Sequence, residues 1–489
     1  MARQSIRFCR RGDVVEHVPV SPVQTVLDYL RLEEKSKGTK EGCNEGDCGA
    51  CTVALGSLEN GRVVYEPVNA CILLMGQIDG KELVTVDDLA TNGKLHPIQK
   101  AFVDNHASQC GFCTPGFVMS LFTLYHAGRK PTRQNIVDHI AGNLCRCTGY
   151  RPIVDAAMKC CTGKPADSWA AGAKETAAQL AALNDGVDLF WGDTSTFFAA
   201  PATQEALAAL CAEHPDATIV AGATDVGLWI TKQLRNLPKI IYIGRAKGLD
   251  TIFDHGQHIS IGASATYAAA EAHLAAIDPD IGEVIRRIGA KQVRASGTVG
   301  GNIANGSPIG DSPPMLIALG ATLHLRHGES ERHIRMEDFF VAYGKQDRAA
   351  GELVWRVDIP KLKANEVFRA YKLTKRFDQD ISAVMSAFKF TLDGRTITSA
   401  RIVFGGMAAT PKRAAQAELA LRGTSLDKPQ DWERAIAALA ADYQPIDDMR
   451  ASAEYRLVAA CAFLRKALME IATGTSRATR VIGVREKAA

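Results

Sequence analysis

Eight of the thirteen cysteines lie between residues 42 and 150, in two groups of four. The first group has the spacing C-x4-C-x2-C with a fourth cysteine well downstream, and consists of Cys43, Cys48, Cys51 and Cys71. The second joins a C-x2-C to a C-x-C, and consists of Cys110, Cys113, Cys145 and Cys147. Thiolates are soft ligands that suit zinc and iron–sulfur clusters, so each group predicts a metal site.

The spacing of the first group is that of a plant-type [2Fe–2S] site. Gly42, Gly46 and Gly49 interleave with its cysteines. Glycine lets the backbone wrap closely, so that N–H groups can point at cluster sulfur and favour the reduced state. A zinc site usually pairs C-x2-C with a second C-x2-C or with H-x3-5-H, and the first group has neither. An iron–sulfur cluster is therefore the favoured interpretation.

The spacing of the second group is less diagnostic, and taken alone it leaves zinc as an alternative. Its C-x-C places two ligands on one turn of backbone. Cys113 and Cys147 each lead into a predicted helix, whose N-terminal dipole would stabilise a negatively charged cluster. Beside the first group, a second [2Fe–2S] cluster is favoured. Two clusters imply transfer of single electrons, which enter from one redox centre and leave to another.

Composition excludes several classes of protein. The chain has 489 residues, 46% apolar and 23% charged, with 57 basic and 54 acidic side chains. That near balance gives no reason to expect binding to nucleic acid or an anionic membrane. No apolar run approaches the roughly 18 residues of a membrane span, and the N-terminus lacks the pattern of a signal peptide. An odd, crowded set of cysteines fits metal binding in the cytoplasm better than a disulfide framework.

Two kinds of local pattern surround the cysteine groups. Residues 3–8 and 14–20 alternate apolar and polar around a turn at Arg11–Asp13, which predicts a hairpin. Ser21 or Thr25 could cap the helix that follows, and two strands flank an Asn60-Gly61 turn. We expect a small β-grasp unit over residues 1–90.

The next part of the sequence is helical. Four segments with helical periodicity predict a four-helix unit over residues 91–162. Thr114 and Pro115 look like the cap and first-turn pair of one of these helices. Residues 163–192 are rich in Ala, Gly and polar residues and are interpreted as a linker, partly helical. Alternating strands and helices then predict an α+β domain over 193–370 and a mixed C-terminal domain over 371–489.

Two glycine-rich loops stand out in the middle domain. They are IVAGATDVG, residues 219–227, and GTVGGNIANGSPIGDSPP, residues 297–314. Successive backbone N–H groups in such loops can form a nest for a pyrophosphate, and plain surface turns are the alternative. Neither G-x-G-x-x-G after a strand nor a P-loop occurs. We therefore predict a dinucleotide held outside a Rossmann fold, with polar partners from Thr224, Thr298, Asn302, Ser307 and Asp311.

Motifs along nearly the whole chain resemble a known family. GCNEGDCGACTV, NACI, QCGFCTPG, NLCRCTGYRPI, IVAGATDVG, VGGNIANGSPIGDSPP and SAEYR are similar to segments of the iron–sulfur and FAD subunit of bacterial xanthine dehydrogenases, in the molybdenum hydroxylase family. The resemblance implies a multidomain α+β chain. Its expected parts are a ferredoxin-like β-grasp [2Fe–2S] domain, a four-helix [2Fe–2S] domain, a non-Rossmann FAD domain of the PCMH type and a C-terminal domain like that of CO dehydrogenase flavoproteins.

The resemblance also implies an activity and a partner. Electrons from the oxidation of hypoxanthine or xanthine to urate would leave a molybdopterin site on a large partner chain, in an α2β2 assembly. They would pass through the cluster of the second group, then the cluster of the first group, then FAD, and reach NAD. Gln109 and Cys147 match positions near the partner's molybdopterin. Residues 375–382 resemble a segment that bears on acceptor choice.

The flavin-contacting positions implied by the resemblance fall in three segments. They are Ile219, Val220, Ala221, Gly222, Ala223, Thr224, Asp225, Val226, Thr298, Gly301, Asn302, Ser307, Asp311 and Lys372. No side chain of this sequence is expected to act as a catalytic acid or base.

Two other functions stay open on the sequence. One is a related molybdenum hydroxylase that oxidises an aldehyde or an N-heterocycle, or that uses another acceptor. The other is a non-catalytic zinc-binding interaction protein. Of the remaining cysteines, Cys211 and Cys461 sit in apolar helices and are expected in the core. The Cys160-Cys161 pair could oxidise, but an ordinary pair of thiols is the simpler interpretation.

Overall fold

The computed structural model describes residues 2–91 and 93–475. Contacts between its residues divide the chain into two compact units, each of which is described by itself. The first unit runs to Lys247 and includes Gly289–Gly297. The second consists of Gly248–Ile288 and the described residues from Thr298 onward.

The first unit opens with a five-stranded sheet in the order β2-β1-β5-β3-β4. Its strands are β1 (Ile6–Arg10), β2 (Asp13–His17), β3 (Thr52–Glu59), β4 (Arg62–Asn69) and β5 (Glu82–Val84). Arg10 pairs with Asp13, so the predicted first hairpin is confirmed. Asn60 and Gly61 turn between β3 and β4 with φ of 48° and 74°, the left-handed values that a tight two-residue hairpin requires.

Short helices connect these strands. They are α1 (Val26–Asp28), which continues into the π-helical turn η1 (Tyr29–Glu33), then η2 (Met75–Ile78) and α2 (Val86–Leu89). Thr25 is the N-cap of α1, because its hydroxyl accepts a hydrogen bond from the Asp28 amide at 3.1 Å. The prediction of a cap at Thr25 is therefore confirmed.

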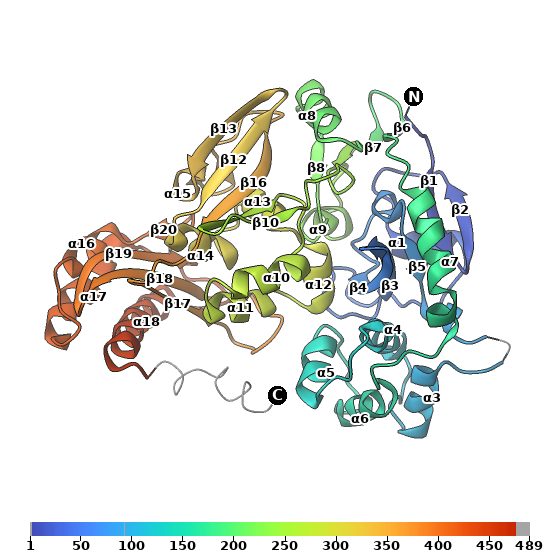
Figure 1. Ribbon diagram of the computed structural model, residues 1–489, viewed down its shortest axis with the longest axis horizontal. Coiled ribbons are helices and arrows are strands. Elements are labelled where there is room, and N and C mark those ends of the chain that lie inside the picture. Colours follow the sequence, from blue (N-terminus) through green and yellow to red (C-terminus); the bar gives the residue numbers. More distant parts are fainter. Residues whose placement is uncertain (1, 92, 476–489) are drawn as a thin grey trace. The chain divides into compact units, whose positions relative to one another are not determined.

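Four helices follow, as the periodicity predicts, and Figure 1 shows them grouped together. They are α3 (Pro97–Asp104), α4 (Thr114–His126), α5 (Arg133–Ile140) and α6 (Arg151–Cys160). Pro115 lies in the first turn of α4, as expected, but Thr114 is not its cap. Cys113 takes the N-cap position with a helical backbone, and the Thr114 hydroxyl instead bonds to Ser108 at 2.7 Å. The helix thus begins one residue earlier than the cap rule suggested.

The predicted linker contains a regular helix, α7 (Ser168–Leu183), which packs against β1 and β4. Asp167 caps it by accepting from the Ala170 amide at 2.8 Å. The rest of the first unit is a four-stranded sheet in the order β6-β7-β9-β8 with three helices. These elements are β6 (Leu189–Gly192), β7 (Phe197–Ala200), α8 (Gln204–Glu213), β8 (Thr218–Val220), α9 (Val226–Thr231), β9 (Lys239–Tyr242) and α12 (Lys291–Ser296).

The second unit contains a five-stranded sheet in the order β10-β11-β16-β12-β13. Its strands are β10 (Ile252–Asp254), β11 (His258–Gly262), β12 (Thr322–His327), β13 (Ser330–Arg335) and β16 (Leu353–Pro360). The accompanying elements are α10 (Tyr267–Ala275), α11 (Pro279–Arg286), α13 (Val299–Asn305), α14 (Ser312–Leu319), α15 (Met336–Phe339), β14 (Phe340–Ala342) and β15 (Lys345–Gln346).

The predicted loop over residues 297–314 is mostly helical. Thr298 caps α13, and α14 begins at Ser312, so only the turn between these helices is irregular. The glycines misled the prediction because Gly300 serves close packing here. A β-carbon at that position would lie 2.5 Å from the Cα of Ala263.

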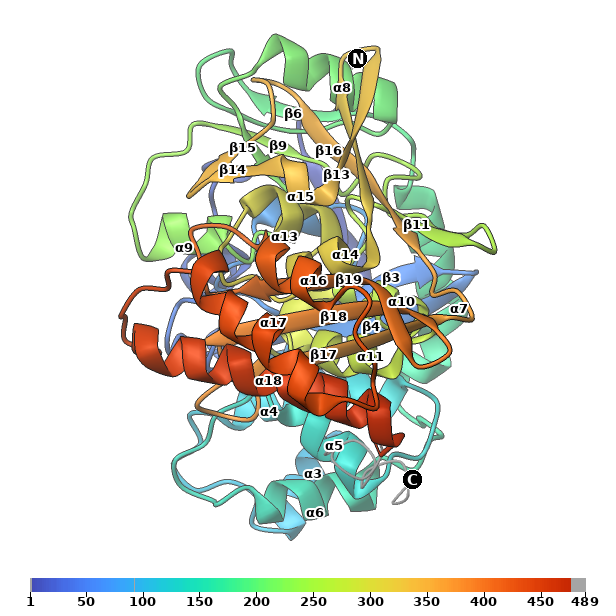
Figure 2. The same cartoon turned by 90° about the vertical axis from the view of Figure 1, so that its left-hand side faces the viewer.

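The last part of the second unit is a sheet in the order β17-β18-β19-β20, with a layer of helices over one face (Figure 2). Its elements are β17 (Glu366–Leu373), β18 (Val384–Asp393), β19 (Thr396–Gly405), β20 (Lys412–Arg413), α16 (Ala415–Leu421), α17 (Pro429–Asp442) and α18 (Ala453–Thr473). Trp432, Phe388 and Phe404 are buried between the two layers. Cys461 packs against this core, and Cys211 is fully buried in the first unit.

No helix within the described ranges, 2–91 and 93–475, has the length and apolar character needed to cross a membrane.

Candidate metal centres and cofactor loops

The first cysteine group lies where the β-grasp sheet meets its long loop. Cys43 and Cys48 are in the loop, Cys51 directly precedes β3, and Cys71 follows β4. Cys51 and Cys71 are 2% and 1% exposed, so half of the group is held in the hydrophobic core. The loop backbone turns its N–H groups toward sulfur. The amides of Asp47 and Cys48 donate to Cys43 Sγ at 3.4 and 3.3 Å.

The four sulfurs of this group form two adjacent pairs. A hydrogen bond from the Cys48 thiol lowers the pKa of Cys43 to about 5. The second pair is Cys51 with Cys71, where the neighbouring Cys51 sulfur raises the pKa of Cys71. One thiol of the first pair is thus poised to ionise, as a metal ligand must.

The second group also forms two pairs, but it lies closer to the surface. Cys110 pairs with Cys147, and both are exposed. Cys113 pairs with Cys145, and burial raises the pKa of Cys113 to about 12. Burial opposes ionisation of Cys145 as well, but hydrogen bonds from the hydroxyl and amide of Thr148 hold its pKa below the ordinary value.

A two-plus-two arrangement is what a two-iron cluster needs, because each iron takes two thiolates beside the bridging sulfides. The paired thiols of both groups fit this arrangement.

The two cysteine groups are in direct backbone contact. The Leu144 amide, beside Cys145, donates to the Cys48 carbonyl at 3.0 Å. Glycines make this approach possible. A β-carbon on Gly116 would lie 2.1 Å from the Gly49 carbonyl oxygen. The Asn143 side chain closes the contact by donating to that same carbonyl at 3.1 Å.

The first cysteine group also contacts the glycine loop over residues 219–227. Ile72, next to Cys71, lies between the two. A β-carbon on Gly46 would come within 2.5 Å of its Cδ1, and one on Gly227 within 2.6 Å of its Cβ. Lys232, at the end of α9, donates to the Cys43 carbonyl and lies 3.8 Å from Glu45. The Gln77 amide donates to Ala221 at 2.9 Å.

The 219–227 loop is tightly constrained. Ala223 has a φ of 59°, a left-handed conformation that an alanine adopts only at a cost of about 1 kcal/mol. Gly222 has no room for a side chain, because a β-carbon there would lie 2.0 Å from the Ser296 carbonyl oxygen. Burial raises the pKa of Asp225 at the start of α9. Such strain and burial are typical of a loop shaped for a ligand.

The other predicted flavin positions lie in the second unit. Thr298 caps α13 by accepting from the Gly301 amide at 3.0 Å. The Asn302 side chain accepts from Ser312 at 2.8 Å. Asp311 receives Lys372 in a buried ion pair and also accepts from the Ser382 hydroxyl. Ser307 lies in the turn between α13 and α14, where its hydroxyl accepts from the Ile309 amide at 3.4 Å.

Four family models match the chain along most of its length. They are a 2Fe-2S iron-sulfur cluster binding domain (13–75), a [2Fe-2S] binding domain (85–158), the FAD binding domain in molybdopterin dehydrogenase (193–362) and the CO dehydrogenase flavoprotein C-terminal domain (369–471).

Named relatives agree with these models. The chain is 32% identical over 460 residues to a xanthine dehydrogenase/oxidase of Rattus norvegicus, covering 83% of this chain and 34% of that protein. It is 30% identical over 485 residues to a xanthine dehydrogenase of Blastobotrys adeninivorans, covering 79% and 34%. The chain thus spans about a third of the length of these curated relatives.

A solved structure decides the matter. A chain of reconstituted CO dehydrogenase from Oligotropha carboxidovorans is 30% identical and superposes with a TM-score of 0.52, covering 56% of this chain and 96% of that one. The chain belongs to the molybdenum hydroxylase family. The matched domains of the chain are two [2Fe–2S] domains, an FAD-binding domain and a C-terminal flavoprotein domain.

Several residues that shape these sites in this molybdenum hydroxylase chain were not predicted as site residues from the sequence. Lys232 and Gln292 lie outside every motif, and only the fold brings them to the cysteine groups. Ile72 and Asn143 stand inside the NACI and NLCRC motifs. Their position beside a ligand was the one signal that could have singled them out.

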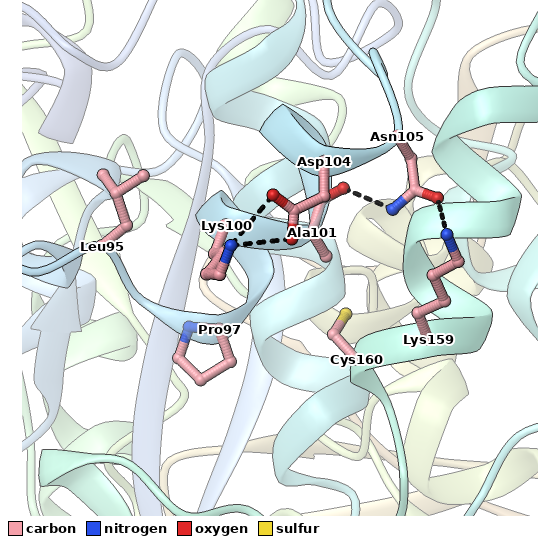
Figure 3. Close-up of a pocket in the computed structure, with 8 residues that line it drawn as sticks. All are labelled: Leu95, Pro97, Lys100, Ala101, Asp104, Asn105, Lys159 and Cys160. Carbon is pink, nitrogen blue, oxygen red and sulfur yellow. Dashed lines mark hydrogen bonds and ion pairs between the residues drawn. The ribbon is translucent and has the colours of Figure 1, made fainter.

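A separate hollow of about 450 Å³ opens between α3 and α6 (Figure 3). Its lysines bond to neighbouring side chains that line the same hollow. Lys100 bonds to Asp104 at 2.9 Å, and Lys159 donates to Asn105. Cys160 lines the hollow, with its sulfur 3.8 Å from that of Cys161. None of the thirteen cysteines, all within the described residues, forms a disulfide, and Cys160 and Cys161 belong to neither group.

Proposed function

We propose that this chain carries electrons from a molybdenum–pterin site on a large partner chain to NAD, during the oxidation of hypoxanthine and xanthine to urate. The observation that carries the proposal is the order of contacts in the first unit. The second cysteine group contacts the first through Leu144 and Cys48, and the first contacts the 219–227 loop through Ile72 and Lys232.

The eight cysteines of the two groups would hold the two clusters. Cys43, Cys48, Cys51 and Cys71 would hold one, and Cys110, Cys113, Cys145 and Cys147 the other. The buried thiols of the first group exclude water, and the amides of Asp47 and Cys48 stabilise added negative charge on sulfur. Cys110, Cys147 and Gln109 are exposed, which supports entry of electrons from a partner at this surface.

The flavin would be held by the segments that the sequence indicated. They are Ile219, Val220, Ala221, Gly222, Ala223, Thr224, Asp225, Val226, Thr298, Gly301, Asn302, Ser307, Asp311 and Lys372. Bound FAD exchanges electrons singly with one-electron centres and in pairs with a nicotinamide, which is the conversion this chain needs before NAD. The tightly turned backbone around Ala223 offers N–H groups for a pyrophosphate, and the Lys372–Asp311 pair fixes a charge in the second unit.

The substrate and acceptor rest on similarity to xanthine dehydrogenases at 30–32% identity. A second candidate is oxidation of an aldehyde or an N-heterocycle. It is favoured by a solved quinoline 2-oxidoreductase from Pseudomonas putida 86, which is 25% identical with a TM-score of 0.51 over 56% of this chain. An α2β2 assembly with the partner is proposed in either case.

Cofactor content is the first test. The purified chain is expected to be red-brown, with about four irons and about one FAD, and with two distinct [2Fe–2S] signals in electron paramagnetic resonance (EPR) after reduction. Cys43→Ser is expected to remove one of these signals and leave the other. A colourless protein that binds zinc would overturn the proposal, and so would retention of both signals in the variant.

Turnover by the assembled complex is the second test. With xanthine and NAD, the complex is expected to form urate and NADH. The matched substrates are an aldehyde and quinoline, each assayed with NAD and with O₂. Turnover of either with no urate formation would reject xanthine as the substrate and leave the electron-transfer role standing. Urate formation with O₂ alone would reject NAD as the acceptor.

A further inference from the structure

Gln292 places a fully buried amide between the two cysteine groups. It lies on α12 and is 0% exposed. Its Nε2 lies 3.2 Å from three acceptor oxygens, namely Thr52 Oγ1, Ser120 Oγ and Asn143 Oδ1, which share its two hydrogens. Segment 289–297 falls within the matched FAD-binding stretch of the sequence, yet it packs as part of the first unit.

The orientation of this amide follows from its partners. The Thr52 hydroxyl already donates to the Gly49 carbonyl at 2.7 Å, and the Ser120 hydroxyl to Asn143 Oδ1 at 2.6 Å. Both hydroxyls can therefore only accept from Gln292, so the nitrogen must face them. The Gln292 oxygen is buried without a partner and points at Gly142, where a β-carbon would lie 2.0 Å away. A buried orphan acceptor is costly and needs an explanation.

Each residue that Gln292 contacts belongs to a segment that carries a cysteine of one group or the other. Thr52 follows Cys51, and Asn143 comes two residues before Cys145. Ser120 lies on α4, whose N-cap is Cys113. Asn143 in turn donates to Gly49, between Cys48 and Cys51. The Gln292 side chain thus contacts residues on both sides of the hydrogen bond between the Leu144 amide and the Cys48 carbonyl.

The same segment reaches the 219–227 loop at its other end. The Ser296 carbonyl lies against Gly222, and Thr224 Oγ1 would be 3.5 Å from a β-carbon on Gly297. Within the first unit, α12 therefore contacts both cysteine groups and the loop proposed to hold the flavin.

We propose that Gln292 is a positioning residue for electron transfer between the two clusters. Its hydrogen bonds to these three oxygens keep the Leu144 amide within hydrogen-bond distance of the Cys48 carbonyl. Electron tunnelling falls off far more steeply across an unbridged gap than along covalent and hydrogen bonds, so loosening this contact slows transfer. The inference rests on the proposed function, since it requires both clusters.

The test uses Gln292→Met, which keeps the volume and flexibility of the side chain and removes its donor. Lys291→Gln is the matched control on the same helix. It removes only a partly exposed ion pair with Glu66, at 3.0 Å, which contributes little. The full chain with its bound cofactors is photoreduced by a single electron, and the redistribution between clusters is followed by rapid-freeze EPR. The magnetic splitting between the clusters is recorded after full reduction.

Gln292→Met is expected to keep both EPR signals, to slow redistribution several-fold and to change the splitting, whereas Lys291→Gln behaves like the parent. A purely structural role would lower the midpoint of thermal unfolding and leave rate and splitting unchanged. That result overturns the inference and leaves the proposed function intact. If the parent chain lacks two cluster signals, the proposed function fails, and the inference fails with it.

A second variant covers the case in which Gln292→Met binds less iron. Ser120→Ala removes one of the three acceptors, and a smaller slowing in the same direction is expected. A fully loaded Ser120→Ala protein with the parent's rate and splitting would overturn the inference.

Discussion

The two cysteine groups have the same two-plus-two pairing of sulfurs but opposite surroundings. In the first group Cys51 and Cys71 are buried in a sheet core, and the loop of the other two touches α9. In the second group Cys110 and Cys147 are exposed at the surface of a helical unit. This difference is consistent with the proposed direction of electron transfer. The exposed cysteines would face the electron donor, and the two buried cysteines would shield the onward path from solvent.

Position in the fold explains this contrast. The first group is spread from a loop to the end of β4, so its ligands converge only when the sheet has formed. The second group lies before α4 and before α6, at helix starts on the surface. We therefore expect the stability of the fold to depend on the cysteines of the first group and to be largely independent of those of the second.

The largest effect is expected for Cys71→Ser. The change places a hydroxyl in the hydrophobic core and removes one buried ligand, so we expect loss of the first cluster and a stability loss of about 2 kcal/mol or more. EPR and denaturant unfolding measure the two effects. An unfolding midpoint equal to that of the parent would remove the proposed link between this group and folding.

Cys147→Ser is expected to remove the second cluster with little change in stability. The side chain is exposed, so the substitution leaves no cavity and buries no polar group. EPR should show the first signal alone, and the unfolding midpoint should stay close to that of the parent. Collapse of the whole protein in this variant would contradict the contrast between the two groups.

Gly116→Ala probes the contact between the groups. The new β-carbon would lie 2.1 Å from the Gly49 carbonyl oxygen, so the backbones must move apart at a cost of about 1–3 kcal/mol. Both clusters should remain, with a changed magnetic interaction between them. Gly128→Ala is the control, because its surroundings are open, although its φ of 72° carries a smaller conformational cost. Equal EPR spectra for the two variants would show that the close approach of Gly116 to Gly49 does not affect the magnetic interaction between the clusters.

The smallest effect concerns pH. Burial lowers the pKa of His139 to about 3, while in the unfolded chain it is about 6.5. Between these values the unfolded state binds more protons, so stability falls as pH drops through this window. Lys291, Arg294 and Arg129 add to the disfavour of a charged imidazole.

His139→Gln keeps a donor for the Ser120 carbonyl. Between pH 7.5 and 5.5 the parent should lose about 1 kcal/mol more unfolding free energy than this variant. Thermal unfolding at the two pH values measures this loss. The same pH dependence in parent and variant would show that this imidazole is free to charge in the fold.

Local patterns predicted the elements well where one residue type dominates the geometry. Asn60-Gly61 indicated its hairpin, Thr25 its cap, and the apolar periodicity the helices α3–α6. Prediction failed where tertiary packing overrode local preference. Thr114 capped nothing because the backbone was already helical at Cys113, and the glycines of residues 297–314 serve packing in α13.

The candidate sites divide in the same way. Cysteine spacing predicted the two proposed ligand sets, because a cluster requires thiolate ligands and most of these cysteines stand in short motifs. The contacts between sites could not be predicted, because they join residues remote in sequence. Lys232 reaches Cys43, and Gln292 reaches Asn143 and Thr52.

By itself the sequence determined which cofactor chemistry the chain can support, because ligand identity and spacing are local properties of the polypeptide. Only the tertiary structure decided that two cysteines of the first group are buried and two of the second are exposed. It also decided that the two groups touch through Leu144 and Cys48, and that an amide from α12 holds them together. Burial and order of contact arise from packing among distant segments, and no short stretch of sequence encodes them.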